Sequence, residues 1–542
     1  TEAAREKLQK IKTEFERWVW TDPERTDRLA GVYNERFNNL APRKFDGSHL
    51  QLPGASAAFT LYAHQKRGIW RIIADGATYL AHAVGAGKTM TMAAAIMEQR
   101  RLGLIAKAML VVPGHCLAQA AREFLALYPS ARILVADETN FTKDKRARFL
   151  SRAATAIWDA IIITHSAFRF IAVPSAFEQS MIQDELQLYE DLLTRVEPDD
   201  RVSRKRLERL KEGLEERLTA LATRKDDLLT ISEIGVDQIV VDEAQEYRKL
   251  SFATNMSTLK GIDPNGSQRA WDLFVKSRYI ETKNPGRALV LASGTPITNT
   301  LGEMFSVQRL LGYDALHERG LHEFDAWAST FGETTTELEI QPSGKYKPVS
   351  RFASFVNVPE LISMFRSFAD VVMPADLREY VRVPAISTGG RQIVTATPTA
   401  AFKMYQQVLD SRIKAIEMRE GPAQQGDDIL LSVITDGRHA AIDLRLVMPS
   451  NDNEPDNKLN LLVGNAFRIW QETADQVFVR PDGKAYDLPG AAQMIFSDLG
   501  TINVEKTRGF SAYRWIRDEL VRLGAPASEI AYMQDYKKSE AQ

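Results

Sequence analysis

The sequence predicts an α/β fold in which a parallel β-sheet carries a glycine-rich loop at the end of one strand. Short apolar stretches alternate with helical segments, which is typical of a doubly wound parallel sheet. The glycine-rich loop lies at residues 85–89, between an apolar stretch and an alanine-rich helical segment. A second apolar stretch, residues 239–241, is followed directly by two acidic residues. Proteins of this class place their ligands at such strand ends.

The stretch LAHAVGAGKTM, residues 80–90, is typical of a loop that binds phosphate groups. The strict pattern has a further glycine at the position of His82, so the match is partial. Backbone N–H groups would face the anion, Lys88 would neutralise phosphate charge, and the Thr89 hydroxyl would ligate Mg²⁺. The alternative is a helix start with a surface lysine. The nucleotide-binding candidates are Gly85, Ala86, Gly87, Lys88, Thr89 and Met90.

The stretch QIVVDEAQEY, residues 238–247, supplies the second half of such a site. Ile239–Val241 form a β-branched run typical of a buried parallel strand. Asp242 would hold Mg²⁺ at its carboxyl end, and Glu243 would orient and deprotonate the attacking water. The catalytic candidates are therefore Lys88, Asp242 and Glu243, and the metal-ligand candidates are Thr89 and Asp242.

Three further apolar runs show the same succession of strand, turn and helix. Residues 109–112 lead to a turn at Pro113–Gly114. The apolar run in WDAIIITHSAF ends at Thr164–His165, and the one in RALVLASGTPITN ends at Ser293–Thr295. In a parallel sheet these ends would meet at the edge that holds the glycine-rich loop. On this pattern alone, His115 and His165 could each be plain loop residues.

The composition excludes several classes of protein. The 542 residues include 69 Lys or Arg and 71 Asp or Glu, a net charge of -2, so no overall field attracts a polyanion. The single cysteine, Cys116, excludes a disulfide framework and fits a reducing cytoplasm, and no Cys/His group has the spacing of a zinc site. No apolar run approaches the roughly 18 residues of a membrane span. The start, TEAAREKLQK, has no initiator Met, so we expect a piece of a longer polypeptide.

The order of these motifs resembles that of superfamily-two helicases, and among them the Swi/Snf-like translocases of double-stranded DNA. AVGAGKT, VVPGHCLAQ, IIITHS, DEAQ and SGTPITN correspond to motifs I, Ia, Ic, II and III. The resemblance implies a P-loop, RecA-like lobe, ATP and Mg²⁺ as cofactors, and double-stranded DNA as partner. It also removes the need for a glycine at position 82. LYAHQKRGIW looks like the adenine-reading Q motif, in which Gln65 would contact the base, and Gln245 of DEAQ would join the nucleotide site.

The same resemblance implies residues for coupling and for DNA contact. Motif III would couple the nucleotide state to motion through Ser293, Gly294 and Thr295. The expected contacts to nucleic acid are Pro113, Gly114, His115, Thr164, His165, Thr298, Asn299 and Ser497.

We expect three parts along the chain: a helical leader at 1–50, a first RecA-like lobe at 51–385 and the start of a second at 386–542. A helical hairpin at 177–230 and a β-hairpin at 334–352 would be inserted in the first lobe. AAQMIFSDLGT, residues 491–501, looks like motif IV, a strand with Ser497 at its end. Motifs V and VI do not follow within these residues, so we expect nucleotide binding with impaired hydrolysis.

The leader, FERWVWTDPERTDRLAGVYNERFNNL, is similar to that of large phage and plasmid proteins that join an adenine methyltransferase to a Swi/Snf-like motor. This implies a methyltransferase domain elsewhere in the polypeptide, and it leaves restriction and antirestriction roles open. The leading hypothesis is an ATP-driven translocase of double-stranded DNA. Two alternatives remain, an RNA helicase or remodeller with the same ATP site, and a DNA-binding module that does not hydrolyse ATP.

Overall fold

The structure is a computed structural model of the chain. The chain divides into two compact units, Thr1–Glu337 with Pro348–Val383, and Leu338–Lys347 with Pro384–Gln542. The residues described are 2–38, 43–137, 139–196, 201–222, 229–256, 259–298, 300, 302–340, 346–380, 386, 389–419, 421, 423–424, 426–480 and 483–535.

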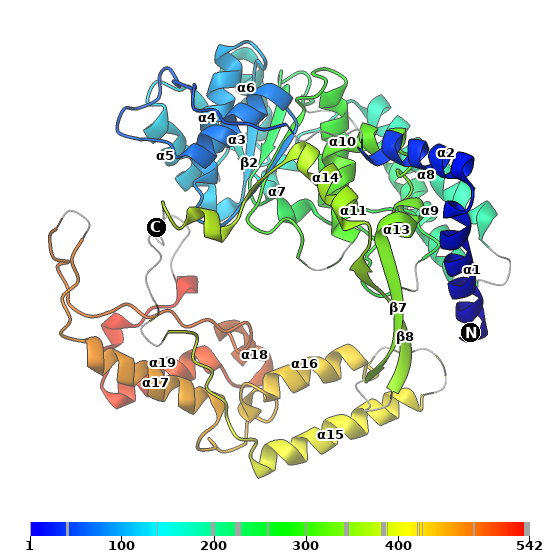
Figure 1. The fold of residues 1–542 in the computed structure, drawn as a ribbon. Coiled ribbons are helices and arrows are strands. Elements are labelled where there is room, and N and C mark those ends of the chain that lie inside the picture. The colour runs from blue at the N-terminus through cyan, green and yellow to red at the C-terminus, as the bar shows by residue number, and fades with distance from the viewer. Residues whose placement is uncertain are drawn as a thin grey trace. The chain divides into compact units, whose positions relative to one another are not determined.

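The first unit is built on a seven-stranded sheet in which every pair of neighbouring strands is parallel (Figure 1). In sheet order the strands are β3 (Ile133–Val135), β4 (Ala160–Thr164), β2 (Ala108–Val112), β5 (Gln238–Val241), β6 (Leu289–Ala292), β1 (Thr78–His82) and β9 (Ala369–Val372). The predicted α/β fold with a parallel sheet is confirmed. The short edge strands β3 and β9 are additions to the strands that the sequence pattern predicts.

Helices cover both faces of this sheet. One face packs against α3 (Ala63–Asp75), α4 (Lys88–Arg101) and α5 (Leu117–Leu127), and Leu110 of β2 belongs to this core. The other packs against α6 (Arg146–Thr155), α8 (Ser175–Arg195), α10 (Gln268–Glu281) and α14 (Val358–Phe368), and Met109 and Val111 belong to this core. Neighbouring residues of one strand thus enter different cores, which explains the continuous apolar runs in the sequence.

The strand order brings three loops together. β6 lies between β1 and β5, so a single strand separates the glycine-rich loop from the acidic pair. Because the strands are parallel, the segments that follow His82, Val241 and Ala292 all leave the sheet at the same edge. This edge holds the candidate site.

A third core lies beside the sheet and is rich in aromatic rings. It is formed by α11 (Gly302–Leu311), α12 (Tyr313–Glu318) and α13 (Phe324–Phe331) with neighbouring loops. Trp327 is completely buried at its centre, and its Nε1 donates to Oε1 of Gln308 at 2.6 Å.

Two helices and a β-hairpin interrupt the first unit along the chain, and Leu338–Lys347 of the hairpin belong to the second unit. α8 and α9 (Arg201–Ala222) pack against each other between β4 and β5, which confirms the predicted helical insertion. A buried ion pair between Glu185 of α8 and Arg309 joins this insertion to α11. β7 (Gly332–Ile340) and β8 (Tyr346–Phe355) form a separate two-stranded sheet. Residues 197–200, 223–228 and 341–345 of the two expected insertions lie outside the described residues.

The leader contains α1 (Glu2–Trp20), α2 (Pro23–Tyr33) and a π-helical turn, η1 (Asn34–Asn38). No helix in the described part of the chain combines the length and the apolar character that crossing a membrane requires. The remaining short helices are η2 (Gly114–Cys116), α7 (His165–Phe168), η3 (Ala244–Tyr247), η4 (Pro374–Leu377), η5 (Leu444–Leu446), η6 (Ile502–Val504), α18 (Glu505–Arg508), η7 (Ala527–Glu529) and η8 (Met533–Asp535).

From residue 386 onward the described residues form helices and loops. The long helices are α15 (Ala400–Glu417), α16 (Leu430–Ala440), α17 (Lys458–Thr473) and α19 (Ala512–Leu523), and α17 packs on α19 through Leu459 and Ile516. The stretch 491–501 is not the strand that we expected. A strand needs a neighbour for its N–H and C=O groups, and the described residues after 386 offer only an isolated bridge, Val479 to Ala485.

Trp327→Ala is expected to destabilise the first unit by about 3–5 kcal/mol, because it opens a cavity and removes the partner of Gln308. Trp20→Ala is the matched control, since this side chain is 74% exposed. The control is expected to change stability by less than about 0.5 kcal/mol. Urea unfolding followed by circular dichroism measures both, and equal effects of the two substitutions would contradict the packing described for α13.

Candidate nucleotide-binding site

The loop between β1 and α4 has the shape that binding a phosphate requires. Gly85 and Gly87 have φ angles of 87° and 73°, in the left-handed region that residues with a side chain rarely adopt. α4 begins at Lys88, so its first N–H groups have no partner within the helix. Such a helix start favours an anion, also because of the helix dipole. Lys88, Thr89 and Met90 are half-buried in this first turn.

Two neighbouring side chains of α3 hold the peptide groups of the loop. Nε2 of His64 lies 2.9 Å from the carbonyl oxygen of Ala86, and Nε2 of Gln65 donates to that of Gly87 at 3.1 Å. In a trans peptide, the C=O and the following N–H point in opposite directions. With both carbonyls held toward α3, the N–H groups of Gly87 and Lys88 are directed away from it, where they can receive an anion.

The same contacts use the side chain of Gln65 inside the protein. Its Oε1 accepts the N–H of Tyr62 at 2.9 Å, its Nε2 is bonded to Gly87, and only 3% of the residue is exposed. Gln65 therefore fixes the loop in this conformation. Its contact with adenine stays a prediction.

His82 stands where the strict pattern has glycine, and it fixes the start of the loop to the neighbouring strand β9. Its Nε2 lies 2.7 Å from Oδ2 of Asp370 on β9, and Arg67 of α3 donates to both oxygens of Asp370 at 2.8 and 3.1 Å. Burial lowers the pKa of His82, although the bond to Asp370 opposes this shift. Burial alone would raise the pKa of Asp370, but the bonds from His82 and Arg67 lower it overall. This cluster ties β1, β9 and α3 together.

The acidic pair lies at the end of β5. Burial, and then the charge of Glu243, raise the pKa of Asp242 to about 6, while the N–H of Glu243 and the Lys88 ammonium act in the opposite direction. Glu243 itself is left-handed, with φ 51° and ψ 50°. This conformation costs a non-glycine residue roughly 1–2 kcal/mol, and such strain is concentrated at functional sites.

A chain of hydrogen bonds links the end of β6 to Glu243. The N–H of Thr295 donates to Oγ of Ser293 at 3.0 Å, and this hydroxyl donates to Oε1 of Gln245 at 2.6 Å. Nε2 of Gln245 then donates to Oε2 of Glu243 at 2.6 Å. The segment predicted to be motif III therefore holds the carboxylate predicted to be the base.

The oxygen atoms at this edge fit Mg²⁺ in their chemistry, because this ion takes oxygen ligands and keeps several waters. Burial first, and then the charge of Glu243, raise the pKa of Asp242, and a divalent cation beside it would favour its charged form. Among the described residues, no group of three or more His, Cys, Asp and Glu is placed to hold a metal ion. Phosphate and water oxygens would have to complete the coordination by Thr89 and Asp242.

The residues predicted to contact nucleic acid are placed differently from one another. Gly114, His115 and Thr298 are exposed, Thr164 is half-exposed, and Pro113 is buried. His165 is only 7% exposed and its Nε2 lies 2.9 Å from the carbonyl oxygen of Asp242, so its ring supports the end of β5. Ser497 belongs to the second unit, where its hydroxyl donates to the carbonyl of Leu499. Asn299 lies outside the described residues.

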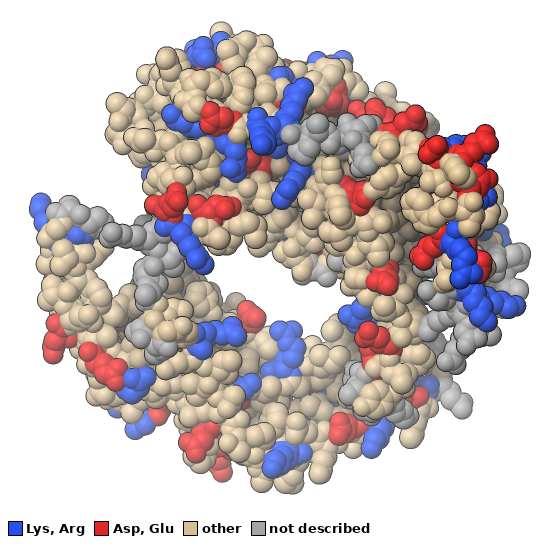
Figure 2. All heavy atoms as spheres, in the orientation of Figure 1, with Lys and Arg blue, Asp and Glu red and all other residues tan. Residues whose placement is uncertain are grey.

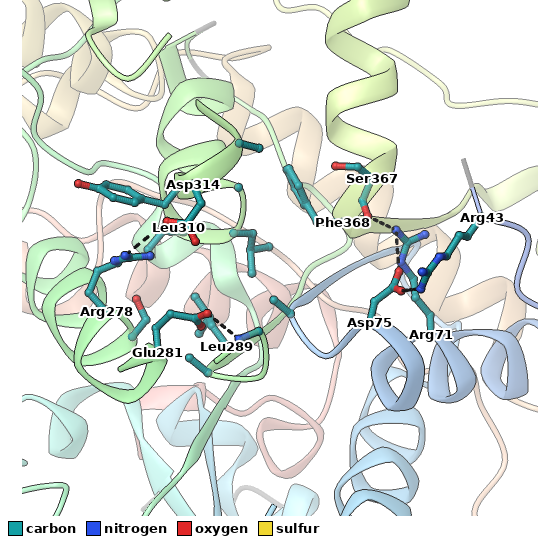
Figure 3. Close-up of a pocket in the computed structure, with 18 of the residues that line it drawn as sticks. Arg43, Arg71, Asp75, Arg278, Glu281, Leu289, Leu310, Asp314, Ser367 and Phe368 are labelled. Carbon is teal, nitrogen blue, oxygen red and sulfur yellow. Dashed lines mark hydrogen bonds and ion pairs between the residues drawn. The ribbon is translucent and has the colours of Figure 1, made fainter. Parts of the chain in front are cut away.

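A separate cavity of about 430 Å³ lies at the opposite edge of the sheet, where β1 and β6 begin (Figure 3). Arg71 and Asp75 at the end of α3 lie on one side, and Arg278 at the end of α10 lies on the other. Its charges are already partnered: Arg71 donates to two carbonyls at the end of α14, and Arg278 forms an ion pair with Asp314. It contains none of the residues of the glycine-rich loop or the acidic pair, so it is distinct from the candidate nucleotide site.

Sequence reasoning missed three residues that support the glycine-rich loop, His64, Arg67 and Asp370. It also missed Arg248 and Glu303, which connect the loops after β5 and β6 outside the nucleotide site. The role of His64 could have been predicted from the sequence, since this residue adjoins Gln65 in the expected Q motif. No sequence pattern indicates the role of Asp370, because it lies about 290 positions after His82 in a four-residue strand.

A family model described as "Probable helicase domain" matches residues 70–372, more than half of the chain, and a domain of unknown function matches residues 1–39. The Defense against restriction protein B of Escherichia phage P1 is 24% identical in an alignment of 453 residues that covers 76% of this chain and 20% of that protein. The chain thus spans about a fifth of the length of this relative.

Two solved structures of the SWI2/SNF2 ATPase core of Sulfolobus solfataricus are also similar. The complex with dsDNA is 15% identical with a TM-score of 0.32, over 79% of this chain and 67% of that one. The core domain alone is 14% identical with a TM-score of 0.32, over 81% and 69%. At this TM-score the similarity adds nothing to what the parallel sheet itself establishes.

Gly87→Ala is expected to weaken ATP binding at least tenfold, about 1.4 kcal/mol. An added Cβ would lie 2.4 Å from Nε2 of Gln65, and φ is already positive. Gly103→Ala is the matched control, because its φ is +72° but its Cβ would meet no atom within 4 Å. Titration calorimetry compares the two variants, and an unchanged affinity in Gly87→Ala would contradict the role of Gln65 in holding the loop.

Proposed function

The chain belongs to the probable helicase domain family, and from this premise we propose that it is an ATP-driven motor that translocates along double-stranded DNA. The coarser conclusion, a helicase-like ATPase motor, follows from the family. The observation that carries the proposal is the convergence of two features at one edge of the sheet. One is a glycine loop whose carbonyls are hydrogen-bonded to α3, and the other is an acidic pair in which Glu243 is left-handed.

The residues of the glycine loop and of the acidic pair divide the steps of ATP hydrolysis among them. The N–H groups of Gly87 and Lys88 and the Lys88 ammonium would bind the phosphates, and Thr89 and Asp242 would hold Mg²⁺. When bound, the ion would supply positive charge that offsets the negative charge of the phosphates. Glu243 orients the attacking water and accepts its proton. Gln245 and Ser293 hold the Glu243 carboxylate in position through their hydrogen bonds.

The proposed DNA surface lies at the same edge, on the loops that follow β2, β4 and β6. Its exposed members are Gly114, His115 and Thr298, with Thr164 beside them. Basic and acidic side chains are interspersed on the face shown in Figure 2, and the net charge is -2. Binding therefore depends on local contacts to phosphates, which carry no base code.

A curated relative supports a place for the motor in a larger protein. One relative is a phage protein named for defence against restriction, and it is about five times longer than the matched segment. We place this chain as the motor of such a protein, in which an adenine methyltransferase domain is a further expected part. An RNA remodeller and a non-hydrolysing DNA clamp are the two alternatives that the experiments below separate from it.

Glu243→Gln is expected to retain binding of ATP and Mg²⁺ but to lose hydrolysis, because it keeps the shape of the side chain and removes the base. Asp242→Asn should instead raise the Mg²⁺ concentration needed for nucleotide binding, and Lys88→Ala should abolish that binding. Calorimetry measures binding and phosphate release measures hydrolysis, in the longer polypeptide if the chain alone is slow. Unchanged turnover in Glu243→Gln would remove this residue from the role of base. An unmeasurable rate in every form, with DNA bound, would favour the clamp.

Duplex DNA is expected to bind better than single-stranded DNA or RNA, with little dependence on sequence and a steep decrease with salt. Contacts to phosphates release counterions, and each one adds about -0.9 to the slope of log K against log salt. Fluorescence anisotropy at two salt concentrations measures this for the three nucleic acids. A preference for RNA would support the remodeller, and an affinity independent of salt would contradict binding through phosphates.

A further inference from the structure

A buried carboxylate joins the proposed DNA surface to the segment that carries the acidic pair. Glu303, in the first turn of α11, is only 3% exposed. Its Oε2 accepts the N–H of Thr298 at 2.8 Å, and its Oε1 lies 3.0 Å from Nε of Arg248. Thr298 follows β6, whereas Arg248 follows β5 and lies five residues after Glu243. One side chain therefore holds both loops.

This link is independent of the chain of hydrogen bonds described above. That chain connects Ser293 to Gln245, and the second link connects Thr298 to Arg248 through Glu303. Tyr79 of β1 is buried next to both, and its pKa is raised first by burial and also by the charges of Glu303 and Glu243. The two loops are thus fastened at two points, with a packed tyrosine beside them.

The chemistry of the second link makes it sensitive to movement. A buried carboxylate is stable only while its cation and its N–H donor stay in place. If bound DNA displaces the exposed loop at Thr298, Glu303 must either follow it and shift relative to Arg248 or lose the N–H of Thr298. Any such shift reaches the segment of Glu243, because Arg248 and Glu243 belong to the same short stretch after β5.

We infer that the Arg248–Glu303 pair is a positioning device that transmits the binding of DNA at Thr298 to Glu243 at the nucleotide site. The inference rests on the proposed function. It assigns neither residue to contact with ATP or DNA. Its consequence is that the pair sets the coupling between the two ligands and has little influence on the affinity for ATP alone.

The chain offers a matched control for a merely structural effect. Glu185 and Arg309 form another buried ion pair, and Arg309 belongs to the same helix, α11, as Glu303. This pair joins α11 to α8. Arg309 also donates to the carbonyl oxygen of Ser251 in the loop after β5, and Glu185→Gln leaves that bond in place. Glu185→Gln should therefore lower stability in the same way as Glu303→Gln without changing the coupling.

The experiment measures the affinity for a fluorescent ATP analogue with and without saturating duplex DNA. The ratio of the two affinities is the coupling factor, which is reciprocal between the two ligands and needs no hydrolysis. We expect a factor of about fivefold or more in the unmodified chain. It should fall to within about twofold of one in Glu303→Gln, with the affinity for the analogue alone nearly unchanged, and remain at the unmodified value in Glu185→Gln.

Arg248→Gln provides a second route if Glu303→Gln does not fold. It leaves the bond from Thr298 to Glu303 and removes the ion pair, so it should also abolish the coupling. The double variant should then add no further loss, because both substitutions break the same link. A normal coupling factor in either folded single variant overturns the inference. So does a factor of one in the unmodified chain when both ligands bind. Failure to bind ATP, or to bind duplex DNA, refutes the proposed function instead.

Discussion

Parallel pairing of strands that are buried on both faces constrains everything else in the first unit. Once β1, β6 and β5 are neighbours and run in one direction, their carboxyl ends must lie at one edge, whatever residues follow them. The loops that leave this edge then have their polar groups within reach of one another. The opposite edge receives the ends of the helices, and the arginines there bond to their carbonyls and to nearby acids. The two edges of one sheet thus have different chemistry.

The candidate site contains several features that are unfavourable for a folded chain without a ligand. Glu243 is left-handed, Asp242 has a raised pKa, and the first N–H groups of α4 have no partner within the helix. Contacts from other elements hold these parts in place: α3 and β9 hold the glycine loop and its strand, and Ser293 after β6 holds Gln245, which bonds to Glu243. Preorganised groups of this kind stabilise charge without reorganising when a ligand binds. The contacts around the site therefore keep the left-handed Glu243 and the glycine loop in the conformation that a ligand would need.

The loop would contact phosphate mainly through backbone N–H groups, and this explains why the loop can lack the glycine of the strict pattern at position 82. In the strict pattern, the position of His82 is a glycine. Here a histidine occupies it because its side chain turns beneath the loop and bonds to Asp370. The part of the loop that would face a ligand needs left-handed residues only at Gly85 and Gly87. A side chain at position 82 therefore does not obstruct that part.

The sequence by itself determined the parallel sheet, the glycine loop and the acidic pair, because each depends on residues that are adjacent along the chain. Apolar runs, glycines at fixed spacing and acids at a strand end are local patterns. Only the tertiary structure decided how His64 and Gln65 hold the loop, that His165 is buried, that Asp370 bonds to His82, and that Glu303 bonds to Thr298. These contacts join residues that are distant in sequence or depend on the direction of a side chain, and neither leaves a periodic trace. The stretch 491–501 shows the same limit, because an apolar pattern becomes a strand only where another strand pairs with it.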